Sequence, residues 1–198
     1  IISDKQGTTR SLVQGIYNEE DTQIVFIDTP GISKPLNKLG NKLNSQAYYS
    51  TYDADALVLV MDAKEKLGKG DMFVLDKMKS LEKPVILVIN KIDKLSNEEI
   101  LKKIDELKDL YPFSDIVPVS AETGDNVKRL IEVLKKYLTC DVKYYPKEEK
   151  TSEPIEKRLA EIVREKVLNL TNEEVPHSVH TILSDLTEDE KTINVYVD

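Results

Sequence analysis

Three short apolar runs, at residues 56–61, 85–89 and 116–119, constrain the fold of this chain more than any other feature. Each run is nearly continuous in Val, Ile and Leu, which is typical of strands buried on both faces of a parallel sheet. Segments of helical periodicity lie at 71–82, 97–111 and 126–138. Because strands and helices alternate, the sequence predicts an α/β fold with a right-handed, doubly wound, mostly parallel sheet.

The region before the first of these runs predicts a β-hairpin. Two β-rich stretches, 12–17 and 23–28, flank the polar run 18–21. A polar run of this length between two such stretches favours antiparallel pairing. We therefore expect the mostly parallel sheet to carry an antiparallel edge strand.

The pattern changes after residue 138, which indicates a second unit. Residues 139–153 contain Pro146, a run of Lys and Glu and no period, as in a linker. A helix is predicted from Pro154 to Leu170, followed by strands at 178–186 and 192–197 around a turn at 187–190. We predict three parts: a domain at 1–138, a linker at 139–153, and an incomplete, smaller α+β domain at 154–198.

Charge and composition exclude several classes of protein. With 28 Lys and Arg against 36 Asp and Glu, the net charge of −8 excludes a general polyanion-coating surface, so any nucleic-acid contact must be local. The single cysteine, Cys140, cannot form an internal disulfide. The apolar runs are far shorter than the ~20 residues that span a bilayer. We expect a cytoplasmic protein.

Two segments near the N-terminus have the chemistry of a metal and phosphate site. Asp28 and Gly31 come directly after a predicted strand, in the sequence Asp-Thr-Pro-Gly. A carboxylate there can hold Mg²⁺ through water, and the Gly31 N–H can reach a terminal phosphate. The hydroxyl of Thr8 or of Thr9 could complete the Mg²⁺ shell. Taken alone, each segment is equally an ordinary turn or loop.

Two further strand ends have the chemistry of a purine site. Asn90, Lys91 and Asp93 follow the run 85–89, and Ser120 and Ala121 follow the run 116–119. A carboxylate such as Asp93 can accept hydrogen bonds from the N1–H and 2-amino group of guanine, which adenine does not offer. Lys91 can cover a face of the base, Asn90 can brace the loop, and the Ala121 N–H can face the guanine oxygen. Each motif alone could be a solvated loop.

All four motifs occur in order, and in this the chain resembles the translation-factor-like GTPases and, among them, the TrmE–Era–Der group. The linker and the segments 161–167 and 174–179 are similar to Era-like GTPases, whose second domain is a KH-type RNA-binding module. The resemblance implies a P-loop GTPase-type fold with part of a KH-like domain, binding of GTP, GDP and Mg²⁺, and GTP hydrolysis. It also implies GTP-gated binding to 16S rRNA and the small ribosomal subunit in ribosome assembly.

Alternatives remain open at this point. One is a sibling GTPase that acts in tRNA modification or large-subunit assembly, and another is a non-catalytic RNA-binding scaffold. A peripheral association with membranes also stays open, whereas DNA is not an expected partner.

The sequence departs from the family pattern in three respects. No G-x-x-x-x-G-K-[ST] motif occurs in the 198 residues, and no G-x-x-G loop follows the last predicted strand. Ile32 stands where Ras-like enzymes have a water-orienting Gln, so slow intrinsic turnover is expected. We expect this chain to be the middle of a longer protein and to bind GTP feebly by itself.

Overall fold

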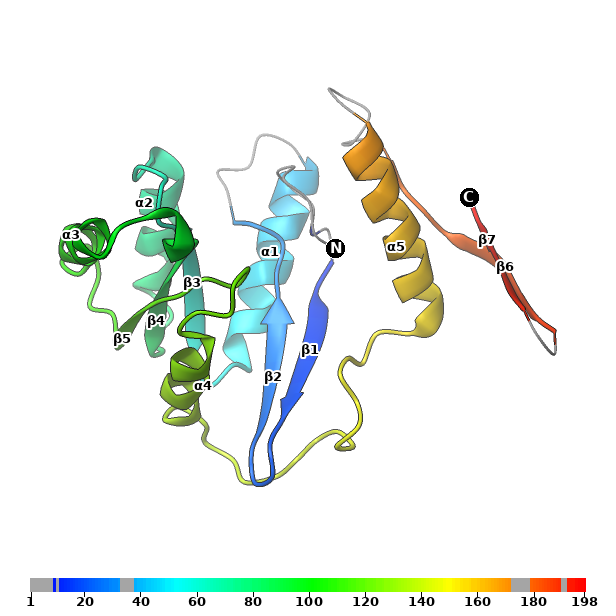
Figure 1. The fold of residues 1–198 in the computed structure, drawn as a ribbon, viewed down its shortest axis with the longest axis horizontal. Coiled ribbons are helices and arrows are strands. Elements are labelled where there is room, and N and C mark those ends of the chain that lie inside the picture. Colours follow the sequence, from blue (N-terminus) through cyan, green and yellow to red (C-terminus); the bar gives the residue numbers. More distant parts are fainter. Residues whose placement is uncertain (1–8, 10, 33–37, 172–178, 190–191) are drawn as a thin grey trace. The chain divides into compact units, whose positions relative to one another are not determined.

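The computed structural model describes residues 9, 11–32, 38–171, 179–189 and 192–198. In chain order the elements are β1 (Val13–Asn18), β2 (Gln23–Asp28), α1 (Lys38–Tyr52), β3 (Leu57–Asp62), α2 (Lys69–Met78), β4 (Val85–Asn90), the 3-10 turn η1 (Ile92–Lys94), α3 (Asn97–Leu107), β5 (Asp115–Pro118), α4 (Val127–Lys135), α5 (Ile155–Leu170), β6 (Leu183–Glu188) and β7 (Ile193–Val197) (Figure 1).

The described residues divide into two compact units. Unit 1 comprises the described parts of Ile1–Asn18, Val25–Gly31 and Tyr145–Asp198, and unit 2 comprises Glu19–Ile24 and the described part of Ile32–Tyr144. The domain boundaries predicted from the sequence stay a prediction. Each unit is described separately below.

Unit 2 is built on a three-stranded parallel sheet in the order β3-β4-β5. The register pairs Leu57 with Val85 and Ile86 with Asp115. All five residues 85–89 of the central strand are buried, with exposures of 3% or less. A strand covered on both faces needs apolar side chains at every position, which explains the unbroken apolar run.

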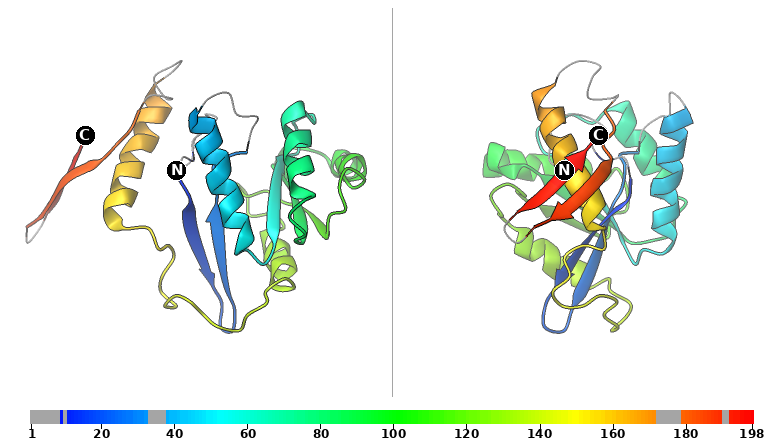
Figure 2. Two further views of the ribbon diagram at one scale, coloured as in Figure 1. Left: turned by 180° about the vertical axis from the view of Figure 1, so that it is seen from behind. Right: turned by 90° about the vertical axis from the view of Figure 1, so that its right-hand side faces the viewer.

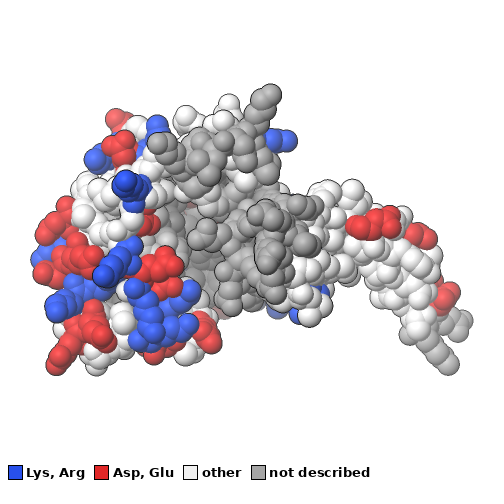
Figure 3. Space-filling model, turned by 90° about the horizontal axis from the view of Figure 1, so that it is seen from above, with Lys and Arg blue, Asp and Glu red and all other residues white. Residues whose placement is uncertain are grey.

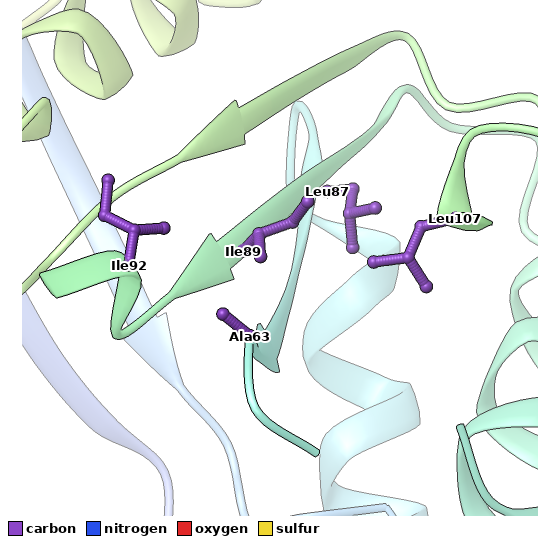
Figure 4. Packing of buried hydrophobic residues seen from close by; sticks show 5 residues of the cluster. All are labelled: Ala63, Leu87, Ile89, Ile92 and Leu107. Carbon is purple, nitrogen blue, oxygen red and sulfur yellow. The ribbon is translucent and has the colours of Figure 1, made fainter. Parts of the chain in front are cut away.

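A core cluster joins this sheet to α3 and to the loop after β4. It consists of Ala63, Leu87, Ile89, Ile92 and Leu107, none more than 7% exposed. Figure 4 shows Leu87 of β4 beside Leu107 of α3, and Ile92 on the 3-10 turn η1 that follows β4. Burying one such side chain contributes about 1.5–3 kcal/mol to stability. The loop after β4 is therefore anchored in the core through Ile92.

The helix boundaries follow from local signals. Helix α3 begins after Ser96, whose N–H bonds Glu99 Oε2 at 2.8 Å while the Glu99 N–H bonds Ser96 Oγ at 3.4 Å. This reciprocal capping box satisfies two backbone N–H groups at the start of the helix, those of Ser96 and Glu99. The predicted helix at 97–111 is too long, because the chain turns before Pro112.

Two other helices also differ from the sequence prediction. Helix α2 ends at Met78 rather than at residue 82, where Glu82 has a φ of 48° and cannot continue a helix. Helix α1 was not predicted, since its sequence is rich in Asn, Ser and Gly and has little apolar periodicity. Its described buried residues are Asn44 and Ala47.

Unit 1 contains β1, the part of β2 from Val25 onward and the C-terminal elements. Strands β1 and β2 form a two-stranded sheet, and their four-residue connection permits only antiparallel pairing. Strands β6 and β7 pair antiparallel, with a register shift between Leu183 and Asp185, and lie beside α5 (Figure 2). The first of them runs from 183 to 188, so residues 187 and 188 belong to a strand and not to the predicted turn.

The segment after Tyr144 has no helix or strand up to Ile155, yet it is bound along β1. The Ile16 N–H bonds the Lys150 carbonyl oxygen at 2.8 Å, and Thr151 Oγ1 donates to the Gln14 carbonyl oxygen at 2.6 Å. Asn18 Nδ2 donates to the Glu149 carbonyl oxygen at 3.1 Å. Residues 149–151 therefore bind β1 along the edge that does not pair with β2.

Charges of both signs share the surface of unit 2. On the face shown in Figure 3, Lys and Arg are interspersed with Asp and Glu, so this face has no field of a single sign. The β6–β7 hairpin instead carries Asp185, Glu188 and Asp189. Among the described helices, none has both the length and the apolar character needed to cross a membrane.

Candidate functional site

The loop after β4 begins with a left-handed residue. Lys91 has φ 66° and ψ 36°, a conformation that costs a non-glycine residue about 1–2 kcal/mol. Asn90 Oδ1 compensates by accepting the Lys91 N–H at 2.8 Å. The same oxygen accepts the Ala121 N–H at 3.0 Å. One amide side chain thus fixes the bend after β4 and ties it to the loop after β5.

A second bond links the same two loops through Asp93. Ser120 is fully buried, and its Oγ donates to Asp93 Oδ1 at 2.6 Å. Ser120 Oγ also accepts the Thr123 N–H at 3.2 Å. The Ile92 N–H bonds the Val119 carbonyl oxygen at 3.2 Å. The Asp93 carboxylate is therefore held in one orientation by a side chain that water does not reach.

The loop after β5 is shaped by two residues with positive φ. Gly124 has a φ of 81°, which a glycine adopts without steric cost. Asn126 has a φ of 58°, and its Nδ2 donates to the Pro118 carbonyl oxygen at 2.7 Å. The Ser120 N–H bonds the Asp125 carbonyl oxygen at 3.0 Å, which closes the loop on itself. Ser120 and Ala121 thus belong to a turn that is closed by hydrogen bonds.

The structure brings together five residues that the sequence analysis assigned to the purine: Asn90, Lys91, Asp93, Ser120 and Ala121. It gives the Ala121 N–H a protein acceptor, Asn90 Oδ1, where the sequence analysis expected it to face the guanine oxygen. An oriented carboxylate beside rigid backbone at the C-terminal edge of a parallel sheet can recognise a base edge with paired donors. The contact of each residue with guanine stays a prediction.

The structure adds a residue that the sequence analysis missed. Asp62, the last residue of β3, lies in register with Asn90, and its Oδ2 is 2.7 Å from Lys91 Nζ. Its Oδ1 accepts the Lys64 N–H at 2.9 Å. Burial raises the pKa of Asp62, but the bonds from Lys91 and Lys64 and nearby lysine charges hold that pKa below its usual value. The sequence did offer a signal for Asp62, because a polar residue directly follows each of the apolar runs 56–61 and 85–89.

Two of the predicted metal residues, Thr9 and Asp28, lie in unit 1. Thr9 Oγ1 donates to Asp28 Oδ2 at 3.3 Å, and Asp28 is exposed at the end of β2. A hydroxyl and a carboxylate are the hard oxygen ligands that Mg²⁺ prefers, and Mg²⁺ usually takes its other ligands from phosphates and water. These two residues therefore fit a Mg²⁺ ion that is bound together with a phosphate. Thr8 lies outside the described residues.

Gly31 follows this pair with open space beside it. A Cβ built on Gly31 would meet no atom within 4 Å, whereas the preceding Pro30 is fully buried. A buried proline fixes the turn, and the open side leaves room for a ligand at the Gly31 backbone. In the part of the chain that the structure describes, no three His, Cys, Asp or Glu side chains gather in a metal-binding cluster. A Mg²⁺ ion here would depend on ligands beyond the protein's carboxylates.

The metal-end residues and the purine-end residues belong to different units. Thr9, Asp28 and Gly31 lie in unit 1, and the residues that follow β4 and β5 lie in unit 2. That both groups serve one nucleotide stays a prediction from the sequence.

Comparison with known proteins connects this geometry to a family. A family model described as a 50S ribosome-binding GTPase matches residues 1–91. A crystal structure of Era in complex with MgGDPNP and a segment of 16S ribosomal RNA is 37% identical in sequence. It matches with a TM-score of 0.91 over 100% of this chain and 69% of that chain.

Two further structures are similar. A variant of Aquifex aeolicus Era bound to GDP.AlF4- is 37% identical, with a TM-score of 0.91 over 100% of this chain and 68% of that chain. The elongation factor SelB from Methanococcus maripaludis, in complex with a GTP analogue, is 24% identical, with a TM-score of 0.54 over 71% of this chain and 31% of its own. The SelB match supports the fold alone. Together these matches confirm the predicted fold class, a P-loop GTPase-type α/β fold.

Proposed function

The chain belongs to the Era family of GTPases, and from this premise we propose that it is a GTP-dependent switch that binds 16S rRNA and the small ribosomal subunit during ribosome assembly. The family membership makes it a GTPase. The Era relatives were crystallised with MgGDPNP and with GDP.AlF4-, which supports GTP, GDP and Mg²⁺ as its ligands. The 16S rRNA segment bound to one relative supports the RNA partner. A cytoplasmic location is part of the same proposal.

The observation that carries the GTP assignment is the bond between Ser120 and Asp93. A 2.6 Å bond from a fully buried hydroxyl orients the carboxylate at the C-terminal edge of the parallel sheet. Such a carboxylate can accept both donors on the guanine edge, and adenine would leave it unpaired. Hydrogen bonds already join the two loops before any ligand arrives, which lowers the cost of binding.

The other residues have separate tasks in the proposal. Thr9 and Asp28 hold Mg²⁺ when it is bound, and the metal then neutralises charge that develops on the phosphates. The Gly31 N–H senses the terminal phosphate, and no covalent intermediate on the protein is required. Ile32 has no group that could orient water, so the protein's own turnover is slow.

Base selection provides the test. Asp93→Asn should weaken GDP binding and improve binding of xanthosine diphosphate, whose base presents a carbonyl oxygen where guanine has the amine. We would measure both dissociation constants by calorimetric titration. Glu122→Gln is the control, since it removes an exposed carboxylate from the neighbouring loop, the one that follows β5. An unchanged ratio of the two constants in Asp93→Asn would defeat the base-site assignment.

RNA binding requires its own assay. We would measure binding of a 16S rRNA 3′-terminal oligonucleotide with GDP and with a non-hydrolysable GTP analogue. Tighter binding with the GTP analogue supports the switch, and equal binding in both states contradicts it.

A further inference from the structure

The ion pair between Asp62 and Lys91 differs from most ion pairs of unit 2 in where it lies. Several of the others join residues three apart on one helix, as Lys108 and Asp105 do. Asp62 and Lys91 come from different strand ends, and the register of β3 with β4 places them at the same edge of the sheet as Asp93. The Asp62 side chain is only 19% exposed. This pair is therefore part of the loop structure around the proposed base site.

The carboxylate of Asp62 is itself held on both sides. Oδ1 accepts the Lys64 N–H at 2.9 Å, and Oδ2 contacts Lys91 Nζ at 2.7 Å. The Ala63 N–H bonds the Asn90 carbonyl oxygen at 2.8 Å, which fixes the backbone next to Asp62. A carboxylate with both oxygens engaged has little rotational freedom, so it can hold a flexible lysine in one place.

Both ends of the Lys91 side chain are consequently fixed. Its backbone is left-handed and bonded to Asn90, and its ammonium is bonded to Asp62. A lysine has a flexible stem of four carbons, and it loses substantial rotamer freedom when the stem is ordered. Here that loss occurs on folding, before a nucleotide binds. The methylene stem between the two fixed ends is then already ordered for contact with a flat, apolar surface.

We propose that Asp62 is a positioning residue of the base site, which holds Lys91 so that its methylene stem covers one face of the guanine ring. The proposal rests on the proposed function and deepens it. Asp62 acts through Lys91 and does not touch the base edge, so it strengthens binding without choosing among purines. Base selection belongs to Asp93, which gives the two aspartates distinguishable effects.

The test compares GDP with inosine diphosphate, whose base lacks the 2-amino group. Asp62→Asn keeps the shape of the side chain and removes its charge. We expect both nucleotides to bind roughly tenfold more weakly, the size of effect associated with ordering one long side chain, and the ratio of their dissociation constants to stay unchanged. Asp93→Asn should change that ratio instead.

A matched control separates this role from a general loss of an ion pair. Asp115 begins β5, at the opposite end of the same sheet, with a side chain 27% exposed and 3.6 Å from Lys136. Asp115→Asn should leave both dissociation constants unchanged. A combined variant tests whether Asp62 works through Lys91. Lys91→Met keeps an unbranched stem without the ammonium, and adding Asp62→Asn to it should weaken binding no further.

Each outcome decides between the claims. Equal weakening of both nucleotides, with no further loss in the Lys91→Met background, supports the positioning role. GDP binding by Asp62→Asn within twofold of the unsubstituted protein, a changed GDP to inosine diphosphate ratio, or a full additional loss in the Lys91→Met background overturns it. If a longer form that carries a G-x-x-x-x-G-K-[ST] motif binds neither nucleotide, the proposed function itself fails, and this inference fails with it.

Discussion

Removing one buried hydroxyl should weaken the connection between the loops that follow β4 and β5. Ser120→Ala deletes the 2.6 Å bond to Asp93 and the acceptor of the Thr123 N–H at 3.2 Å, while the methyl group fits the same space. A hydrogen bond to a charged group contributes about 1.5–3 kcal/mol, and the low end applies because Asp93 and Thr123 can turn to water. We expect a loss of roughly 1.5 kcal/mol in the free energy of unfolding.

Chemical denaturation followed by circular dichroism measures this loss, and a GDP titration should show weaker binding because Asp93 is no longer oriented. Ser50→Ala is the matched control. Ser50 Oγ donates at 2.8 Å to the Ala47 carbonyl oxygen within α1, a bond that adds little to helix stability. If the two variants unfold at the same denaturant concentration and Ser120→Ala binds GDP normally, the reasoning about the buried hydroxyl is wrong.

Three other outcomes are expected. The pKa of Asp62 is lowered from 3.8 in the folded state, so its contribution to stability is present above that value and is lost as pH falls below it. Denaturation at a series of pH values should therefore show that acid lowers the free energy of unfolding less in Asp62→Asn than in the unsubstituted protein. Gly31→Ala should unfold like the unsubstituted protein, since its Cβ meets no atom within 4 Å. It should compete less well for GTP, measured against GDP, because the new methyl group would occupy the open side of the Gly31 backbone. The 198-residue chain should bind GTP feebly beside any longer form that carries a G-x-x-x-x-G-K-[ST] motif, as a parallel titration of both would show.

The strands were predictable because their signal is local. The apolar run 85–89 corresponds to β4 (Val85–Asn90), since a strand buried on both faces needs apolar residues throughout. The sequence also indicated that polar residues would follow β4 and β5. Helix α1 escaped prediction, because Gly40, Asn41 and Asn44 are poor helix formers and tertiary packing overrides their preference.

The finer geometry of the site could not be predicted, because it depends on contacts between distant residues. The Asp62 to Lys91 bond follows from a parallel register that no short sequence window contains. The left-handed backbone at Lys91 has no propensity signal, since lysine avoids that region. The use of the Ala121 N–H by Asn90 likewise requires both loops to be in place.

The hydrogen bonds between β1 and residues 149–151 have a consequence for solubility. An edge strand with unpaired N–H and C=O groups is a template on which another molecule can add a strand. The Lys150 carbonyl oxygen already accepts the Ile16 N–H, and the Thr151 hydroxyl already donates to the Gln14 carbonyl oxygen. A version of the protein that ends before residue 149 would leave this edge of β1 exposed. A shortened protein made for crystallography should therefore keep residues 149–151, because they prevent self-association through β1.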